Sequence, residues 1–558
     1  MDDITWDPPG KGPWELETTH FARPLTRFSQ SAFCTGFPKG FAEGTKRYGL
    51  LLSHMEPGVV NGFLYTQPVA VGAPKGASGP PPPPVLWALV RLHPEIRARV
   101  KAGVRAFEDK QWRQDMQTWD TVDKPAAVAR HREIQAVDVA ALSDDELAEH
   151  VLRCRDHVED SMYLHHKYTV SSTLVTGDFL AGAAAWTGMT AGQLMSLFQG
   201  TSPISKGVAS VELDEAAKAV TASDPARRVL DGGGPAADAL SALAADAAAG
   251  AEVTSYLDAV RYRSVGYDVG DSTAGEMPDL LLGALRAAVA GTSEAPGSET
   301  ALATVRAAVP AEHLDDFDGR LTEARLVNRL RDERAVYSDG WATGLARRAL
   351  LEAGSRLNRA GHLADAAHAV DLEAAEVAAL LRGGPGPSAE EAHRRYTWRT
   401  TRTIDDAPPF LRAVPGAPPA VGLLPEGARR GAAAVNTMLA NLFVVAEAPN
   451  TDTVLHGLAV NTGSYEGPAR LVADAADFGR VQQGDVLVTR MTSPYFNVVL
   501  PLLGAIVTDR GGQLSHAAIV AREYGIPGIV GTRDATRTIP DGARVRVDGA
   551  TGEVRLLS

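Results

Sequence analysis

The pattern of apolar residues changes along the chain, and this change constrains the fold more than any other feature. Between residues 85 and 400, apolar positions recur at spacings of three and four, which predicts α-helices. From about residue 455, short apolar runs separated by turn residues predict β-strands instead. Repeated Pro and Gly in residues 405–431 prevent regular structure there. We therefore expect a multidomain protein, with a largely α-helical N-terminal domain and a C-terminal α/β domain.

The expected domain boundaries follow from these changes. Residues 1–404 form the helical domain, 405–436 a Pro/Gly-rich linker, and 437–558 the α/β domain. Residues 1–84 are rich in Gly, Pro and aromatic residues without clean periodicity, so we expect irregular structure there. Residues 210–310 are rich in alanine with Gly and Ser breaks, which predicts short helices joined by loops.

Three longer helices are predicted inside the helical domain. Ser143 is a suitable N-cap because three acidic residues follow it, and apolar residues continue the helical spacing to about Tyr168. A second helix is expected to begin near Asp318 and a third to run from Trp341 to Asn358.

Composition and charge exclude several classes of function. The 558 residues are 45% apolar and carry a net charge of −13, which argues against a general nucleic-acid or anionic-membrane binder. The longest apolar stretch, Val498–Val507, is too short to span a bilayer and contains Pro501. The acidic start of the chain does not resemble a secretory signal, so we expect a cytoplasmic protein.

Cysteine usage argues against a disulfide framework and against a cysteine metal site. Only Cys34 and Cys154 occur, far apart in the sequence. No histidine spacing of the HExxH type is present either. We therefore expect no metal ligands on this chain.

One segment of the C-terminal domain predicts chemistry. A buried strand leads into Gly511 and Gly512, Ser515 can cap a helix, and that helix starts at His516 and stops at Gly525. Unpaired N–H groups in a first helical turn favour an anion, and glycines let a phosphate approach the backbone. An imidazole there can be neutral and nucleophilic at physiological pH. The alternative is that His516 is a polar residue near a helix start, without a chemical role.

The same segment resembles the phosphohistidine signature of the phosphoenolpyruvate-utilising enzymes. Two glycines are followed by Ser-His and then by Ala-Ala-Ile-Val-Ala-Arg-Glu-Tyr-Gly-Ile-Pro. The flanking Thr492-Ser493-Pro494 and Val547-Asp548-Gly549 also resemble that family. The resemblance implies a swivelling domain in which His516 accepts a phosphoryl group at one site and delivers it at another. The residues expected to support the phosphoryl group are Gly511, Gly512, Ser515, Thr492 and Arg522.

The parts of the family that we do not find indicate how the phosphoryl group would be supplied. Only 42 residues follow His516, so we expect no pyruvate-handling barrel and no pyruvate half-reaction. Residues 1–400 look too helical to hold an ATP-grasp domain, and the loop around Gly40 has the wrong spacing for a P-loop. We therefore expect no tightly bound cofactor, with ATP and Mg²⁺ used through a separate ATP-grasp subunit.

The helical domain resembles the substrate-binding part of rifampicin phosphotransferase, and phenylphosphate synthase, with its divided subunits, is a second comparison. The segments that carry this resemblance are Pro24–Thr26, Asn61–Tyr65 and Gly340–Leu381. It implies a small acceptor that bears a hydroxyl group. The many aromatic residues near the N-terminus suit a phenolic or polyketide-like acceptor, although aromatic residues usually form core.

Cationic and basic residues for such an acceptor are expected in the helical domain. Arg334, Arg347 and Arg348 lie in the region of best resemblance, and the alternative for each is a solvated charge on a helix face. His165 and His166 lie on the long helix and are candidates for a general base or a metal pair. Their alternative is a helix histidine with satisfied hydrogen bonds.

The sequence thus favours a phosphotransferase component that carries a phosphoryl group on His516 and passes it to a small hydroxylated molecule. A second hypothesis is a ligand-binding protein in which the mobile domain serves as a lid without phosphotransfer. A third is a dehydratase that phosphorylates a hydroxyl group in order to eliminate it.

Overall fold

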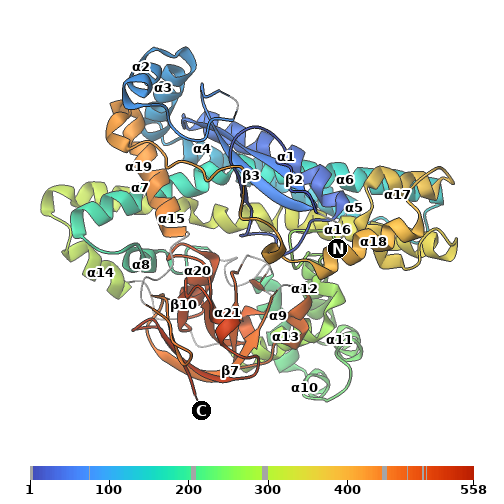
Figure 1. Cartoon of the computed structure of the whole chain (residues 1–558). Helices are drawn as coiled ribbons and strands as arrows, with labels where there is room; N and C mark the ends of the chain where they lie inside the picture. The colour runs from blue at the N-terminus through green and yellow to red at the C-terminus, as the bar shows by residue number, and fades with distance from the viewer. Residues whose placement is uncertain are drawn as a thin grey trace. The chain divides into compact units, whose positions relative to one another are not determined.

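A computed structural model of the chain confirms the expected multidomain, largely helical architecture with a C-terminal α/β part (Figure 1). It describes residues 4–74, 76–202, 209–291, 299–442, 449–473, 475–492, 496–497 and 499–557. The chain divides into two compact units. Unit 1 comprises Met1–Leu174, Tyr267–Gly270 and Arg334–Ala433, and unit 2 comprises Val175–Gly266, Asp271–Glu333 and Ala434–Ser558.

Unit 1 contains long helices and a small antiparallel sheet with strand order β2-β3-β1-β4. The β2–β3 hairpin packs on α1, and α1 and α16 both pack on α6 (Figure 1). Its strands are β1 (Trp14–Leu16), β2 (Leu52–Val60), β3 (Phe63–Ala70) and β4 (Phe410–Leu411). Its helices are α1 (Arg27–Arg47), α2 (Pro83–Leu92), α3 (Pro94–Glu108), α4 (Gln111–Thr118), α5 (Lys124–Gln135), α6 (Asp144–Lys167), α16 (Asp339–Arg359), α17 (Ala374–Leu381) and α18 (Ala389–Thr401).

Unit 2 contains short helices and, in its described residues, an eight-stranded sheet with order β5-β12-β11-β7-β8-β9-β10-β6. Strands β7 to β10 are parallel to one another, and the remaining pairs are antiparallel. Its strands are β5 (Val454–His456), β6 (Leu458–Ala459), β7 (Ser464–Leu471), β8 (Asp485–Thr489), β9 (Leu503–Thr508), β10 (Gly528–Val530), β11 (Arg544–Asp548) and β12 (Glu553–Leu556).

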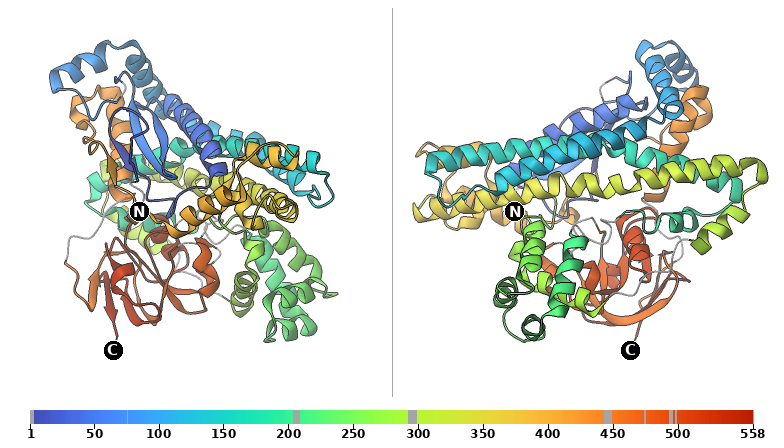
Figure 2. Two further views of the ribbon diagram at one scale, coloured as in Figure 1. Left: turned by 45° about the vertical axis from the view of Figure 1, so that its right-hand side comes forward. Right: turned by 180° about the vertical axis from the view of Figure 1, so that it is seen from behind.

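The alanine-rich segment forms the expected short helices, which Figure 2 shows as a compact group. Unit 2 helices are α8 (Ala191–Met195), α9 (Ser210–Ala222), α10 (Asp224–Leu230), α11 (Ala236–Ala244), α12 (Gly250–Val260), α13 (Pro278–Ala290), α14 (Glu299–Ala307), α20 (His516–Glu523) and α21 (Ala535–Thr538). Three of the boundaries between the units fall inside α7 (Thr169–Thr187), α15 (Leu314–Val336) and α19 (Glu426–Leu442), and the other two enclose Tyr267–Gly270.

The long helices start where the sequence predicts. Ser143 caps α6 with a full capping box, because its hydroxyl accepts from the N–H of Glu146 while the Glu146 carboxylate accepts from the N–H of Ser143. Acidic residues fill the first turn of α6, and His165, His166 and Lys167 fill the last. This charge distribution complements the helix dipole.

The expectation of irregular structure near the N-terminus is wrong, because residues 27–47 form the 21-residue helix α1. The face of α1 that packs on α6 is built from Gly36, Gly40 and Gly44, so it has no apolar periodicity. A Cβ added at Gly40 would lie 2.2 Å from the carbonyl oxygen of Tyr163, closer than any real contact. The two backbones therefore approach each other only because these positions are glycine.

The expected linker is also more ordered than its composition predicts. Phe410 and Leu411 form β4, which pairs with β1, and Leu411 is buried. Helix α19 begins directly after Pro425, where a proline costs no backbone hydrogen bond. The boundary between the two units lies between Ala433 and Ala434, inside this helix. The domain boundaries expected from the sequence therefore differ from the two compact units.

Both cysteines are free, with Cys34 half-buried in α1 and Cys154 buried in α6. Burial raises the pKa of the Cys34 thiol to about 11 and that of the Cys154 thiol to about 12. Among the helices of the described residues, none is both long enough and apolar enough to cross a membrane.

Candidate functional site

His516 is the first residue of α20, directly after the turn that follows strand β9. The hydroxyl oxygen of Ser515 caps the helix and accepts from the N–H of Ala518 at 3.4 Å. Gly511 has φ +116°, in the region that favours glycine, which allows the chain to turn before the cap. The local structure around His516 is therefore the one that the sequence predicts.

Two side chains hold the imidazole ring of His516. Its Nδ1 lies 3.0 Å from Oγ1 of Thr492, and its Nε2 lies 3.0 Å from Oδ1 of Asn497. The amide oxygen of Asn497 only accepts, so in this arrangement Nε2 carries the proton and Nδ1 accepts from the Thr492 hydroxyl. The Thr492 hydroxyl can also accept, so the same contact suits the tautomer with the proton on Nδ1.

A buried ion pair of unit 2 acts on the ring of His516. Asp332 on α15 accepts from Nε and Nη2 of Arg331 at 2.9 and 2.8 Å, and from the Ser202 hydroxyl at 2.7 Å. Burial raises the pKa of Asp332, but Arg331 and Ser202 outweigh this effect and hold it below its ordinary value. Asp332 is therefore an ionised carboxylate whose negative charge is balanced by Arg331.

Burial lowers the pKa of the His516 imidazole to about 3, with Asp332 raising it and Arg331 lowering it. The lone pair of a neutral imidazole is available to an electrophile, so this arrangement keeps His516 in its nucleophilic form. The half-buried ring is held in place by Thr492 and Asn497.

The low pKa of His516 predicts an unusual titration. In the folded protein the His516 ring is expected to stay neutral from pH 8 to pH 5, whereas the unfolded chain titrates near ~6.5. Because the unfolded state binds the proton first, the contribution of His516 to stability is full above that value and falls as the pH drops toward 3. An NMR titration of ¹⁵N-histidine-labelled protein, with the urea-unfolded chain as reference, measures this. A folded-state titration of His516 near pH 6.5 would contradict it.

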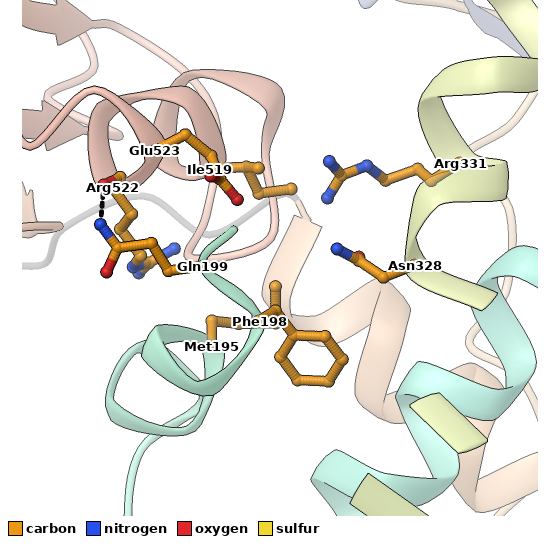
Figure 3. A pocket seen from close by; sticks show the side chains of 8 residues that line it. All are labelled: Met195, Phe198, Gln199, Asn328, Arg331, Ile519, Arg522 and Glu523. Carbon is orange, nitrogen blue, oxygen red and sulfur yellow. Dashed lines mark hydrogen bonds between the residues drawn. The ribbon is translucent and has the colours of Figure 1, made fainter. Parts of the chain in front are cut away.

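A small pocket lies beside α20, on the side where α15 and the segment after α8 approach it (Figure 3). Arg331 and Asn328 point from α15 toward Ile519 and Glu523 in this view. The turn after α8 holds α20, since the Gln199 side-chain amide donates to the Arg522 carbonyl at 2.7 Å. The lining residues are Met195, Phe198, Gln199, Asn328, Arg331, Ile519, Arg522 and Glu523.

Two of the residues expected to support a phosphoryl group have other contacts. The space beside Gly512 is filled by α19, because an added Cβ would lie 2.0 Å from the carbonyl oxygen of Asn441. The N–H of Gly512 donates to the Leu442 carbonyl at 2.8 Å. Gly512 therefore makes room for protein backbone, contrary to the expectation of room for a phosphate.

The side chain of Arg522 contacts the turn that precedes α20. Its guanidinium donates to the carbonyl of Gln513 at 2.9 Å and to the side-chain oxygen of the same residue. Burial lowers the pKa of Arg522 to about 10. In this structure Arg522 braces the turn before α20, and no contact with the ring of His516 is recorded for these described residues.

The candidate acceptor residues separate into two groups within unit 1. His165, His166 and Arg334 lie together, because Arg334 donates to the carbonyl of His165 at 3.4 Å and the two histidine rings stack at 4.5 Å. Arg347 and Arg348 instead donate to backbone carbonyls. The acceptors are Val269 at 3.0 Å for Arg347, and Ile134 at 2.8 Å and Gln135 at 2.9 Å for Arg348.

Several residues beside His516 and His165 carry no clear signal in the sequence. Asn497 follows Thr492 by five positions, and Ser493 and Pro494 between them lie outside the described residues. Arg331 and Asp332 are far from His516 in sequence, and no local pattern connects them. Asp339, which contacts His165, is the first residue of helix α16. An acidic residue directly after Ser338 is typical of a helix start, and this was the one sequence signal for Asp339.

In the part of the chain that the structure describes, no group of three or more His, Cys, Asp or Glu side chains could hold a metal ion. The paired histidines of unit 1 therefore have a carboxylate and an arginine beside them rather than a ligand set.

Residues 481–552 match the model of the mobile domain of PEP-utilising enzymes. This range contains Thr492, Asn497 and His516, so the matched domain is the one that carries the site. Residues 481–552 thus carry a mobile domain of the kind found in PEP-utilising enzymes. The match confirms the resemblance of the strand, glycine and Ser-His pattern to that family.

Several curated proteins are similar to parts of this chain. It is 34% identical over 230 residues to the uncharacterized phosphotransferase YvkC of Bacillus subtilis (strain 168), covering 41% of this chain and 26% of that protein. It is 44% identical over 107 residues to a rifampicin phosphotransferase of Streptomyces sviceus, and this alignment covers 19% of this chain and 12% of that protein. It is 44% identical over 110 residues to a probable phosphoenolpyruvate synthase of Pyrococcus abyssi, and this alignment covers 20% of this chain and 13% of that protein.

The chain thus spans about a quarter or less of the length of these relatives. Among solved structures, the holo-form of Thermococcus kodakaraensis aconitase X aligns with 21% identity and a TM-score of 0.16. That alignment covers 19% of this chain and 98% of the other chain, and its score is too low to support an argument.

Proposed function

We propose that the protein is a phosphotransferase component that carries a phosphoryl group on His516 and transfers it to a hydroxyl group of a small organic acceptor. One observation carries this proposal: the neutral imidazole at the start of α20 has its Nδ1 held by Thr492. A lid without phosphotransfer needs neither a nucleophile nor a residue that orients it.

Attack by Nε2 is proposed from the tautomer with the proton on Nδ1, in which the Nδ1–H donates to the Thr492 hydroxyl. In the arrangement described above Nε2 donates to Oδ1 of Asn497, so this tautomer requires the Asn497 amide to turn over and present its N–H to Nε2. In the transfer step Nε2 attacks phosphorus while the bond from phosphorus to the leaving oxygen breaks, and the Nδ1 proton stays on the ring. The Asn497 amide, once turned over, offers an N–H to a phosphoryl oxygen.

Charge neutralisation accounts for most of the catalysis of phosphoryl transfer. The N–H groups of His516 and Ala517 stand in the first turn of α20, where the helix dipole favours a negative charge. Both N–H groups have no recorded acceptor in the described part of the chain. A phosphoryl group on His516 would therefore lie next to two N–H donors that make no hydrogen bond to another described residue.

The phosphoryl group is proposed to come from ATP, bound with Mg²⁺ on a separate ATP-grasp subunit. The acceptor is proposed to be a small hydroxylated molecule of the phenolic or polyketide-like class. Product analysis separates this function from a dehydratase, because a phosphotransferase releases a stable phosphoester and a dehydratase releases an unsaturated compound and phosphate.

Labelling with γ-³²P-ATP and Mg²⁺ tests the proposed function. The chain mixed with its ATP-grasp subunit is expected to take up about one phosphate, labile to acid and stable to alkali, as for a phosphohistidine. The chain alone is expected to remain unlabelled. ATP turnover by the isolated chain, or label that survives acid, would count against the proposal.

A further inference from the structure

A histidine–aspartate pair lies in unit 1, at the junction of α6 and α16. Nδ1 of His165 lies 2.7 Å from Oδ1 of Asp339, and the side chains are only 10% and 1% exposed. The carboxylate only accepts when ionised, so Nδ1 of His165 carries the proton and Nε2 presents a lone pair. The pair thus fixes the tautomer of a buried imidazole, as an orienting carboxylate does for a general base.

Positive charge accompanies this pair. Arg334 donates to the Thr169 hydroxyl at 2.9 Å and to the His165 carbonyl at 3.4 Å. Burial, with Arg334 and His20 contributing, holds the pKa of His165 well below its usual value. Burial raises the pKa of Asp339 to about 6, against the opposing effect of Arg334. His165 is therefore neutral at physiological pH and presents a lone pair on Nε2. Asp339 favours the imidazolium that forms when this lone pair takes up a proton, and Arg334 opposes it.

Aromatic rings continue from this pair along unit 1. The rings of Phe33, His166 and Tyr267 are half-buried and that of His20 is exposed, and we call these four rings the aromatic surface. Nδ1 of His20 lies 3.0 Å from Oε1 of Glu17. The successive centroid distances are 4.5 Å for His165–His166, 4.5 Å for His166–Phe37, 5.1 Å for Phe37–Phe33, 5.5 Å for Phe33–Phe21, 6.0 Å for Phe21–Tyr267 and 4.9 Å for Tyr267–His20.

Polar contacts from within unit 1 hold the short segment that supplies Tyr267. The Asp268 carboxylate accepts from the N–H of Thr26 at 2.9 Å. Arg347 donates to the Val269 carbonyl at 3.0 Å. The aromatic surface therefore belongs to a fixed part of unit 1, and Arg347 contributes to it by positioning this segment.

We propose that this arrangement is the acceptor site, in which a phenolic ring packs on the aromatic surface and His165 removes the proton from its hydroxyl group, with Asp339 as the positioning residue. The inference rests on the proposed function and assigns the substrate class and the base. A titratable pair beside stacked rings matches a compound with an aromatic body and one polar group.

The transfer step balances with the groups present. The hydroxyl oxygen attacks phosphorus, its proton passes to Nε2 of His165, and the P–N bond to His516 breaks. The electron pair of that bond returns to Nε2 of His516, so the ring is again neutral with its proton on Nδ1, and His165 later releases the proton it has taken up to water. Asp339 stabilises the imidazolium that forms on His165, and Arg334 offsets the charge of the phosphoryl group.

Discharge of the phosphorylated full chain to phenol tests this site without the ATP-grasp subunit. His516 is charged with ³²P-phosphoramidate, excess donor is removed, and formation of phenyl phosphate is followed against phenol concentration. His165→Gln is expected to lower the maximal rate at least about 100-fold and to leave the half-saturating phenol concentration unchanged. Asp339→Asn is expected to act in the same way, and the double variant to be no slower than the slower single variant.

Two further variants separate chemistry from structure. Phe33→Ala is expected to raise the half-saturating phenol concentration several-fold without changing the maximal rate, because it removes only binding surface. His362→Ala, on the exposed turn after α16, is the matched control and should behave as the wild type.

Each outcome decides one question. If the wild type takes up no acid-labile label, the proposed function fails. If it is charged but phenol does not discharge it, the aromatic acceptor class is wrong. If phenol discharges His165→Gln as fast as the wild type, or if the losses in the double variant multiply, His165 and Asp339 are not a base and its positioning residue while the proposed function stands.

Discussion

Replacing His516 by alanine is expected to abolish acid-labile phosphorylation of the chain and to lower phosphotransfer at least ~1,000-fold. The covalent carrier is lost, and no other residue can take over a nucleophile placed at the start of α20. The measurement is ³²P incorporation from ATP with the ATP-grasp subunit, together with incorporation from phosphoramidate. Both labels should disappear because they share one acceptor atom.

His456→Ala is the matched control for this experiment. His456 is half-buried at the end of β5 in the same unit, and its backbone N–H donates to the Asn450 side chain, a contact that alanine keeps. The control is expected to retain the label. Full activity in the His516→Ala protein would support the lid hypothesis, whereas loss of label in both variants would indicate a general loss of fold.

Replacing Gly40 by alanine is expected to destabilise unit 1 by about 3 kcal/mol. The new Cβ would meet the Tyr163 carbonyl oxygen at 2.2 Å and the Lys167 nitrogen at 2.9 Å, so α1 must move away from α6. Backbone atoms cannot turn aside as a flexible side chain can, which places this cost at the upper end for overpacking. Calorimetric melting of the full chain measures the shift.

Gly431→Ala provides the control for that prediction. Gly431 lies in α19, and its nearest neighbours to an added Cβ are Leu50 at 3.8 Å and Phe107 at 3.9 Å, which are ordinary contacts. Alanine at this helical position is expected to be neutral or to stabilise the protein by less than ~1 kcal/mol. Equal melting temperatures for the Gly40 variant and the wild type would show that α1 and α6 are not closely packed in solution.

Local sequence patterns predicted the elements on which the site is built. The cap at Ser515, the helix from His516 and the strand before it depend on residues within a few positions of one another. The same is true of α6, whose start is set by Ser143 and Glu146. Such features are determined by neighbouring residues, so they can be found without knowledge of the fold.

The rest of the phosphohistidine site depends on contacts between distant parts of the chain. Arg331 and Asp332 influence His516 although 183 residues lie between Asp332 and the histidine. Helix α1 was missed for a related reason, since its buried face consists of glycines that fit the backbone of α6. A buried helix face made of glycines can be recognised only when the helix that packs against it is known.

Two histidines of α6, His157 and His165, show that helical spacing alone does not predict the partner of a side chain. The spacing of eight residues places His157 and His165 on one face of α6, and the structure gives them different partners. Nε2 of His157 contacts Nδ1 of His131 at 2.8 Å, whereas His165 contacts Asp339. His157 is therefore a satisfied core histidine, and the presence of a carboxylate, which helical spacing cannot show, distinguishes His165.

The proposed movement of the His516 domain can be tested by site-directed labelling, because Cys34 is half-buried and Cys154 is buried. Maleimide and methanethiosulfonate reagents attack thiolates, and Cys34 and Cys154 have few thiolates at neutral pH because burial raises their pKa to about 11 and about 12. A spin label or dye can therefore be attached to one engineered surface cysteine in each unit while both native residues stay in place. Pulsed electron resonance or single-molecule energy transfer would then report the distance between the units before and after phosphorylation.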